Sequence, residues 1–226
     1  MQIIKEPSYE ILVESTLIDD YRMATGARTC YKSKSSGPDS DKKLISRCFE
    51  NGHHSVLEHS SMTVRFICDR GVSHELVRHR LASFSQESTR YCNYSKDRFG
   101  NEITVVKPIM IDEGTVEYFV WQRQCESAED AYFALLDLGV KPENARSVLP
   151  TCLKTEIVVT ANLREWYHIL DLRTARDAQP DIRYMMHNLL IDMGIKKPEI
   201  FGELMRERNH QFVKDFCHKD FTPEQE

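Results

Sequence analysis

Apolar and polar positions alternate along several short stretches of this chain, and a period of two is typical of strands with one buried face. The alternation is clearest between Met62 and Cys68, where Thr63 and Arg65 occupy polar positions. Pro7 separates two shorter apolar runs near the N-terminus. The strands predicted in this way are residues 3–4, 11–13, 61–69 and 155–160.

Elsewhere apolar residues recur every three to four positions, which predicts helices. The longest such stretch is residues 113–139, an amphipathic helix that Gly139 ends. A short apolar run before Arg78 places Arg78 and Arg80 on a further helix. The other predicted helices are residues 19–29, 41–50, 162–173 and 181–193.

Strands and helices are mixed without a repeating strand–helix–strand unit, so the predicted fold class is α+β. We expect a mainly antiparallel sheet flanked by helices, including the long amphipathic one. The chain has no internal repeat, low-complexity tract or linker, which predicts a single domain over residues 1–226. Residues 218–226 are expected to be a frayed tail.

The composition of the chain excludes several classes of protein. The chain has 226 residues, 41% hydrophobic and 29% charged, with a net charge of −5, which is ordinary for a globular protein and argues against a general nucleic-acid binder. No apolar run is long enough for a signal peptide or a membrane span, so we expect a cytoplasmic protein. Scattered cysteines without a Cys-x-x-Cys pair exclude a zinc-finger spacing and favour small core residues in a reducing compartment.

The most distinctive chemistry lies between residues 78 and 91. Arg78, Arg80 and Arg90 provide three guanidinium groups there, together with His79 and the hydroxyl of Ser88. Guanidinium forks match phosphate and carboxylate oxygens with paired hydrogen bonds. No Gly-x-Gly pair occurs, so a dinucleotide would need its phosphates held by side chains. This segment therefore predicts a site for an anionic small molecule.

A second polar group, His53, His54, Glu58 and His59, first suggests a metal site. One alternative function is therefore a metal-dependent phosphohydrolase acting on a nucleotide. A non-enzymatic alternative is a single-strand RNA-binding module, whose basic and stacking side chains would be Arg78, Arg80, Arg90, Phe84, Tyr91 and Tyr94. The acidic net charge counts against the RNA module, and we predict no bound metal.

The predicted helix 162–173 has one polar face and a single charged residue on its apolar side. Arg164, His168 and Asp171 share one face, as expected for a solvated surface. Arg173 lies about 180° from Arg164, on the side of apolar residues. A charge near apolar surface needs an anionic or hydrogen-bonding partner, so Arg173 is a candidate functional residue.

Four segments together resemble the flavin-dependent thymidylate synthases. The spacing of Arg78, His79, Arg80 and Ser88 is similar to that family's signature, and residues 52–59, 145–150 and 162–173 also resemble family segments. The resemblance implies reductive methylation of dUMP to dTMP, a methyltransferase activity. It further implies 5,10-methylenetetrahydrofolate as one-carbon donor, NADPH-reduced FAD as hydride source, and a homotetramer with shared active sites.

The resemblance also implies residue roles. Arg90 and Arg146 would hold the substrate phosphate, and Arg173 would be the catalytic residue that stabilises negative charge on the uracil ring. The implied dUMP site is Glu75, Leu76, Val77, Arg78, Gln86, Glu87, Ser88, Thr89, Arg90, Arg146 and Arg173. The implied FAD site is His53, Ser55, Arg78, His79, Arg80, Gln86, Asn162, Leu163, Arg164 and His168. Glu75 stands where the family often has Gln, and Asp177 where some members have His; Asp177 is not included in either site.

Overall fold

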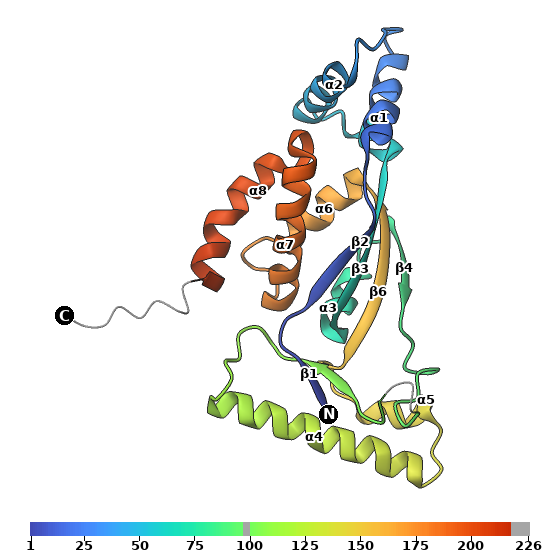
Figure 1. The fold of residues 1–226 in the computed structure, drawn as a ribbon, viewed down its shortest axis with the longest axis vertical. Coiled ribbons are helices and arrows are strands. Elements are labelled where there is room, and N and C mark those ends of the chain that lie inside the picture. Colours follow the sequence, from blue (N-terminus) through green and yellow to red (C-terminus); the bar gives the residue numbers. More distant parts are fainter. Residues whose placement is uncertain (97–99, 218–226) are drawn as a thin grey trace, which may run out of the picture. The chain divides into compact units, whose positions relative to one another are not determined.

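A computed structural model describes residues 1–96 and 100–217 (Figure 1). The predicted frayed tail, residues 218–226, lies outside the described residues. The strands are β1 (Gln2–Ile4), β2 (Ser8–Val13), β3 (Ser61–Asp69), β4 (Ala82–Gln86), β5 (Thr104–Val106) and β6 (Lys154–Asn162). The α-helices are α1 (Leu17–Thr29), α2 (Pro38–Glu50), α3 (Arg70–Leu76), α4 (Val116–Asp137), α5 (Pro142–Ala145), α6 (Leu163–Arg173), α7 (Pro180–Lys196) and α8 (Pro198–Phe212). Short 3₁₀ turns, η1 (His54–His59) and η3 (Arg146–Val148), and a π turn, η4 (Val213–Cys217), complete the elements.

Four strands form an antiparallel sheet in the order β2-β3-β6-β4, flanked by helices. Strands β1 and β5 form a separate parallel pair in which Ile3 lies opposite Val105. Buried and partly exposed residues alternate along the whole of β3 and β6, as the sequence pattern predicts for strands with one covered face. The predicted α+β class with a mainly antiparallel sheet is confirmed.

The described chain divides into two compact units. Unit 1 consists of Met1–Glu10, Arg65–Arg78 and Phe84–Val159, and unit 2 of Ile11–Val64, His79–Ser83 and Thr160–Glu226. Both units are assembled from segments that are far apart in the sequence. The expectation of a single domain stays a prediction.

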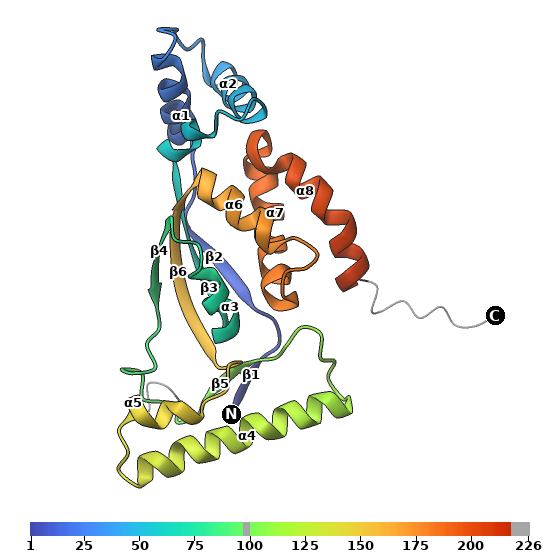
Figure 2. The ribbon, with the colours of Figure 1, turned by 180° about the vertical axis from the view of Figure 1, so that it is seen from behind.

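The core of unit 1 gathers around Tyr132 of α4, together with Val105 and Leu153. Helix α4 runs along the β1–β5 pair (Figure 2). The predicted long helix is confirmed, and it ends just before Gly139, whose φ of 80° suits glycine. Part of its predicted apolar face is exposed, however: Val116 is 75% and Phe119 60% accessible, because the buried face near the middle of the helix is formed by other residues.

Unit 2 is mainly helical, and α7 and α8 lie side by side in both views (Figure 1, Figure 2). Its largest fully buried side chain is Trp166 of α6, whose indole Nε1 donates to the carbonyl of Met62 at 3.0 Å. A buried ion pair joins Lys197 to Asp20. Within residues 1–96 and 100–217, none of the helices combines the length and apolar content needed to cross a bilayer.

The helix after β3 is shorter than predicted. Asp69 caps α3 by accepting from the amide of Val72 at 2.7 Å, and the helix ends at Leu76. The expectation that Arg78 and Arg80 lie on a helix is wrong: both occupy the turn that follows. The Val77 amide still bonds to the carbonyl of Ser73, four residues back, but the Arg78 amide bonds to that of Glu75, only three residues back, so the chain leaves the α-helix there and forms a tighter turn.

Candidate active site

A groove of about 590 Å³ in unit 1 brings together residues from distant parts of the sequence. It is lined by Arg70, Thr89, Glu143, Asn144, Arg146 and Ser147. Arg146 begins η3, directly after the short helix α5, and Thr89 lies in the loop after β4. The groove therefore joins two of the segments that the sequence singled out.

Arg146 and Arg90 both contact this groove through hydrogen bonds. Arg146 donates from Nη1 to Thr89 Oγ1 at 3.1 Å and from Nε to the carbonyl of Glu143 at 3.1 Å. Arg90 donates from Nε to the Glu143 carboxylate at 3.1 Å, and its amide donates to Ser88 Oγ at 3.3 Å. The Arg90–Glu143 pair is half exposed, so an incoming anion can replace the carboxylate at small cost.

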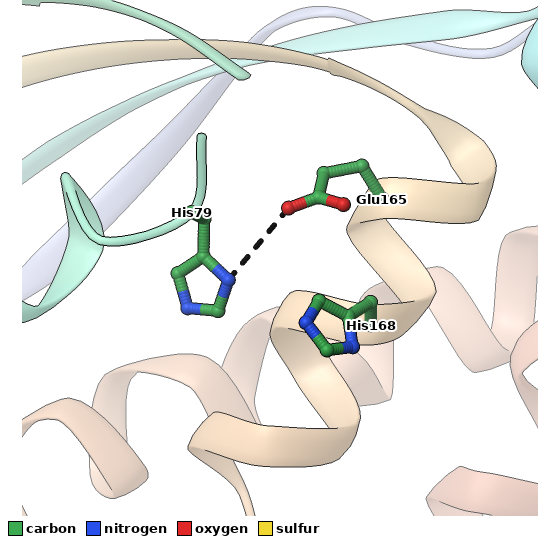
Figure 3. Close-up of side chains that lie close together, drawn as sticks. All are labelled: His79, Glu165 and His168. Atoms are coloured by element: carbon green, nitrogen blue, oxygen red, sulfur yellow. Dashed lines mark ion pairs between the residues drawn. The ribbon is translucent and has the colours of Figure 1, made fainter. Parts of the chain in front are cut away.

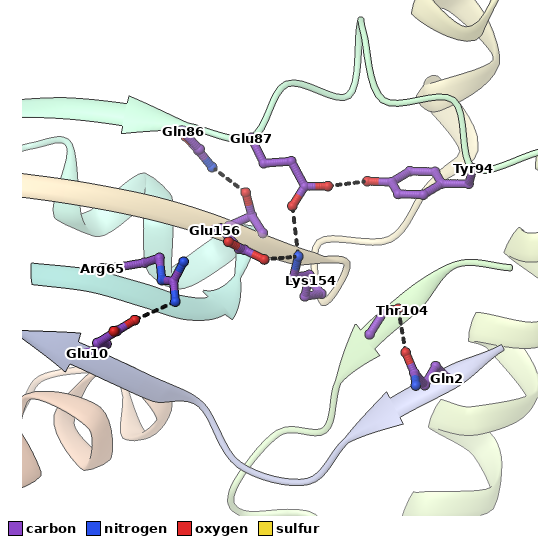
Figure 4. A network of polar contacts seen from close by, with 10 residues as sticks. Gln2, Glu10, Arg65, Gln86, Glu87, Tyr94, Thr104, Lys154 and Glu156 are labelled. Carbon is purple, nitrogen blue, oxygen red and sulfur yellow. Dashed lines mark hydrogen bonds and ion pairs between the residues drawn. The ribbon is translucent and has the colours of Figure 1, made fainter. Parts of the chain in front are cut away.

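Gln86 and Glu87, at the end of β4, are held by a polar network in unit 1 (Figure 4). Gln86 donates from Nε2 to Ser73 Oγ at 2.8 Å and to the Thr155 hydroxyl at 3.1 Å. These bonds fix the Gln86 amide against α3 and β6.

Lys154 holds the second half of this network. It donates to Glu87 at 3.0 Å and to Glu156 at 2.8 Å. Burial is the largest effect on the pKa of Lys154 and lowers it, but the bonds with Glu156 and Glu87 together outweigh burial, and the net pKa is raised. Burial, reinforced by the charge of Glu87, also raises the pKa of Tyr94, whose hydroxyl donates to Glu87 at 3.4 Å.

In unit 2 the start of α6 positions several predicted residues. Asn162 is the N-cap, and its Oδ1 accepts from the amide of Glu165 at 2.9 Å. Arg164 donates to Glu58 at 2.6 Å from an exposed position. Leu163 is fully buried and its amide donates to the Ser60 carbonyl, so its side chain belongs to the core.

His79, Glu165 and His168 of unit 2 lie close together (Figure 3). His79 is 5% exposed, and its Nε2 accepts a hydrogen bond from Arg173 Nε at 3.0 Å. On the other side of the ring, His79 Nδ1 lies 3.7 Å from a carboxylate oxygen of Glu165. The His168 ring stands edge-on to the His79 ring at 5.7 Å between centroids.

Burial, followed by the charges of Arg173 and His168, lowers the pKa of His79 to about 4. The imidazole is therefore neutral near pH 7, and its contact with Glu165 joins a carboxylate to a neutral ring rather than to a cation. Burial raises the pKa of Glu165, an effect that His168 partly opposes.

His79, Glu165 and His168 carry atoms that could ligate a metal, all within 4.8 Å of one another. Against a cation, one nitrogen of His79 already accepts from Arg173, and the adjacent guanidinium raises the energy of a second positive charge. The predicted histidine-rich group has other contacts: His54 Nε2 lies 3.2 Å from the carbonyl of Phe49, and Glu58 is paired with Arg164. The structure thus gives the metal-dependent alternative no support at that group.

The chain is similar to known proteins over most of its length. Residues 11–198 match the family described as "Thymidylate synthase complementing protein". The chain belongs to this family. A "Flavin-dependent thymidylate synthase" of Geobacter sulfurreducens is 36% identical over 85% of this chain and 84% of its own length. Enzymes with the same name from Kosmotoga olearia and Pyrococcus furiosus are 32% and 37% identical, over 80% and 68% of this chain and 82% and 62% of their own lengths.

The family-derived residues divide between the two units. Glu75, Leu76, Val77, Arg78, Gln86, Glu87, Ser88, Thr89, Arg90 and Arg146 are in unit 1, whereas His53, Ser55, His79, Arg80, Asn162, Leu163, Arg164, His168 and Arg173 are in unit 2. Within unit 1 the structure brings Ser88, Thr89, Arg90 and Arg146 together, and within unit 2 it brings His79, His168 and Arg173 together. Arg78, Arg80, His53 and Ser55 are exposed.

Sequence reasoning missed three charged residues of these sites. Glu143 contacts Arg90 and Arg146, Lys154 binds Glu87, and Glu165 faces His79. Glu143 precedes Arg146 by three residues and Glu165 precedes His168 by three, spacings that place side chains on the same side of a helical turn. This spacing is the local feature of the sequence that indicates Glu143 and Glu165.

Proposed function

We propose that this protein catalyses the reductive methylation of dUMP to dTMP, with 5,10-methylenetetrahydrofolate as one-carbon donor and NADPH as reductant. Its family makes the protein a methyltransferase with FAD as cofactor. The observation that carries the proposal is the hydrogen bond between Thr89 and Arg146, which lie 57 residues apart in two separate family segments. Both line one basic groove suited to a phosphate.

In unit 1, Arg90 and Arg146 would bind the nucleotide phosphate, with the Ser88 and Thr89 hydroxyls beside them. Guanidinium groups provide planar, permanently charged donors for phosphate oxygens. Binding would replace the contact of Arg90 with Glu143 by a contact with a more highly charged anion.

In unit 2, Arg173 would stabilise the negative charge that develops on the uracil ring. A positioned cation in a partly water-excluded site lowers the energy of such charge more than bulk water does. Arg173 is suited to this because its Nε is already fixed by His79.

The side chains of unit 2 fit an FAD cofactor. FAD carries a pyrophosphate, and exposed Arg80 and Arg164 provide guanidinium donors for it, with the exposed His168 nearby on α6. The Arg164–Glu58 pair is half exposed and therefore weak enough to exchange partners. Asn162 keeps a side-chain NH₂ group after capping α6. When bound and reduced, the flavin supplies the hydride.

A reconstituted reaction tests the function. Purified protein, FAD, dUMP, 5,10-methylenetetrahydrofolate and NADPH should yield dTMP, separable from dUMP by chromatography. Omitting any one small molecule should abolish the product. Absence of dTMP from the complete mixture, with folded protein, would refute the proposal. A cytoplasmic homotetramer is also part of the proposal, and light scattering of the purified protein tests the subunit number.

A further inference from the structure

His79 is buried in unit 2 with a side chain at each ring nitrogen. Arg173 Nε donates to Nε2 at 3.0 Å, and a carboxylate oxygen of Glu165 lies 3.7 Å from Nδ1. Arg173 is the last residue of α6, and Glu165 stands in the first turn of the same helix. One helix therefore places both a carboxylate and a guanidinium group against the same imidazole.

These contacts define one tautomer of His79. An arginine Nε can only donate, so Nε2 of His79 must offer its lone pair. In the neutral imidazole the proton then resides on Nδ1, which faces the carboxylate of Glu165. The other tautomer would direct an N–H group at the Arg173 N–H and a lone pair at an anionic oxygen.

Glu165 favours this tautomer through its charge. Its side chain is 7% exposed and that of His79 4%, so the attraction between the N–H dipole and the carboxylate is weakly screened. At 3.7 Å the contact is longer than a hydrogen bond. Contacts of this kind in ligand-free sites often tighten when the substrate binds.

The imidazole orients Arg173 without adding a negative charge beside it. A carboxylate at the position of His79 Nε2 would also accept from Arg173, but it would offset the positive charge that the proposed reaction uses. A neutral imidazole fixes the Nε edge of the guanidinium and leaves its charge unchanged.

We propose that Glu165 and His79 are positioning residues for Arg173: the Glu165 carboxylate holds His79 with its proton on Nδ1, and His79 Nε2 in turn fixes the guanidinium. This inference rests on the proposed function of Arg173 at the uracil ring. It gives Glu165, which the family resemblance did not assign, a defined task in the site.

The tautomer can be measured directly on the full chain without substrate. Two-bond ¹H–¹⁵N correlation spectra of protein labelled with ¹⁵N-histidine should show His79 with a protonated Nδ1 and an unprotonated Nε2 at pH 7.5. The His79 signals are those that vanish in His79→Gln or shift in Arg173→Ala. A proton on Nε2, or on both nitrogens, would overturn the proposal.

Kinetics test the consequence for the reaction. Glu165→Leu should lower kcat by about 10–100-fold, as for other losses of an orienting contact. The KM for dUMP should change by less than about 3-fold, because the lost contact acts in the transition state. Glu165→Gln keeps an oxygen acceptor but loses the charge, so its kcat should fall between that of the wild type and that of Glu165→Leu. Glu199→Leu is the matched control: this acid, whose pKa burial also raises, should leave kcat unchanged.

The outcomes separate this inference from the proposed function. If His79 carries its proton on Nε2 while Arg173→Ala still abolishes dTMP formation, the positioning role falls and the function stands. If Glu165→Leu folds and turns over like wild type, Glu165 has no positioning role. If the tautomer is as proposed but Arg173→Ala is fully active, the role of Arg173 falls, and the positioning proposal falls with it.

Discussion

Arg173 donates from Nε to Nε2 of His79 at 3.0 Å, although 94 residues separate them in the sequence. The bond ties the end of α6 to the motif that begins at Arg78. A buried neutral imidazole is a specific acceptor, because its single lone pair accepts along one direction. His79 therefore fixes the Nε edge of the proposed catalytic arginine.

Arg173→Ala should nearly abolish turnover. Loss of a charge-stabilising donor typically costs about 10²–10³-fold in kcat. Arg173→Lys should recover little of this, since an ammonium group lacks the Nε donor that His79 accepts. Rates of dTMP formation at saturating substrates provide the measurement.

Arg176→Ala is the control for that substitution. Arg176 is exposed three residues further on, and its backbone carbonyl accepts a hydrogen bond from Arg183. The activity of Arg176→Ala should equal that of the wild type, and both Arg173→Ala and Arg176→Ala should still bind flavin. Full activity in Arg173→Ala would contradict the role given to this residue.

Arg146→Gln should raise the KM for dUMP by about 10–100-fold, because hydrogen bonds from charged groups contribute about 1.5–3 kcal/mol. Deoxyuridine, which lacks the phosphate, should be used equally poorly by wild type and variant. If the substitution lowered kcat/KM by the same factor for deoxyuridine as for dUMP, Arg146 would not bind the phosphate.

Asn162→Ala should destabilise α6 by about 1 kcal/mol, because Asn162 Oδ1 accepts from the amide of Glu165 at 2.9 Å. Asn162→Asp keeps an oxygen at the N-cap, so its free energy of unfolding should equal that of the wild type. Urea denaturation of flavin-free protein makes the comparison independent of any flavin contact. Equal stability of all three proteins would contradict the cap.

His187 makes the stability of unit 2 sensitive to acid. Burial, followed by the charge of Arg183, lowers its pKa from 6.5 to about 4. The unfolded chain therefore binds a proton at higher pH than the folded one, and the free energy of unfolding falls as the pH drops from 6.5 to 4. The loss is on the order of 3 kcal/mol for this histidine.

His187→Phe should remove this share of the pH dependence. The ring stacks on Phe212 at 3.6 Å, and neither ring nitrogen has a hydrogen-bond partner within the described residues. At pH 8 the variant should be as stable as the wild type or more stable by about 1 kcal/mol. Denaturation at pH 8 and pH 4.5 measures the difference, and His210→Gln, an exposed site, should keep the wild-type slope.

Periodic elements were predictable from the sequence. Strand β3 has the predicted bounds, and α6 ends at the predicted Arg173 and begins one residue after the predicted Asn162. Strand β4 and helix α8 were missed: β4 mixes serines and a glutamine with Ala82 and Phe84, which is a weak strand signal. Helix α1 begins at Leu17, two residues before the predicted start, because Thr16 is the N-cap and the Asp19 carboxylate accepts from the Thr16 amide.

Site residues were predictable where a sequence motif contains them, but not where their role depends on tertiary contacts. Arg173 stood out because a charge on an apolar helix side needs a partner, and that partner is His79. Glu165 did not stand out, since its burial against His79 arises only when the turn after α3 meets α6. The residue types in the motif indicated an anion site, whereas tertiary packing determines which acidic side chains contact its residues.

The central claim, a flavin and a uracil nucleotide bound by these side chains, is tested most directly by visible absorption of the purified protein. Protein incubated with FAD and freed of excess FAD by gel filtration should show oxidised flavin bands. These bands should bleach on addition of NADPH and shift on addition of dUMP. Protein that stays colourless after this treatment would contradict the account.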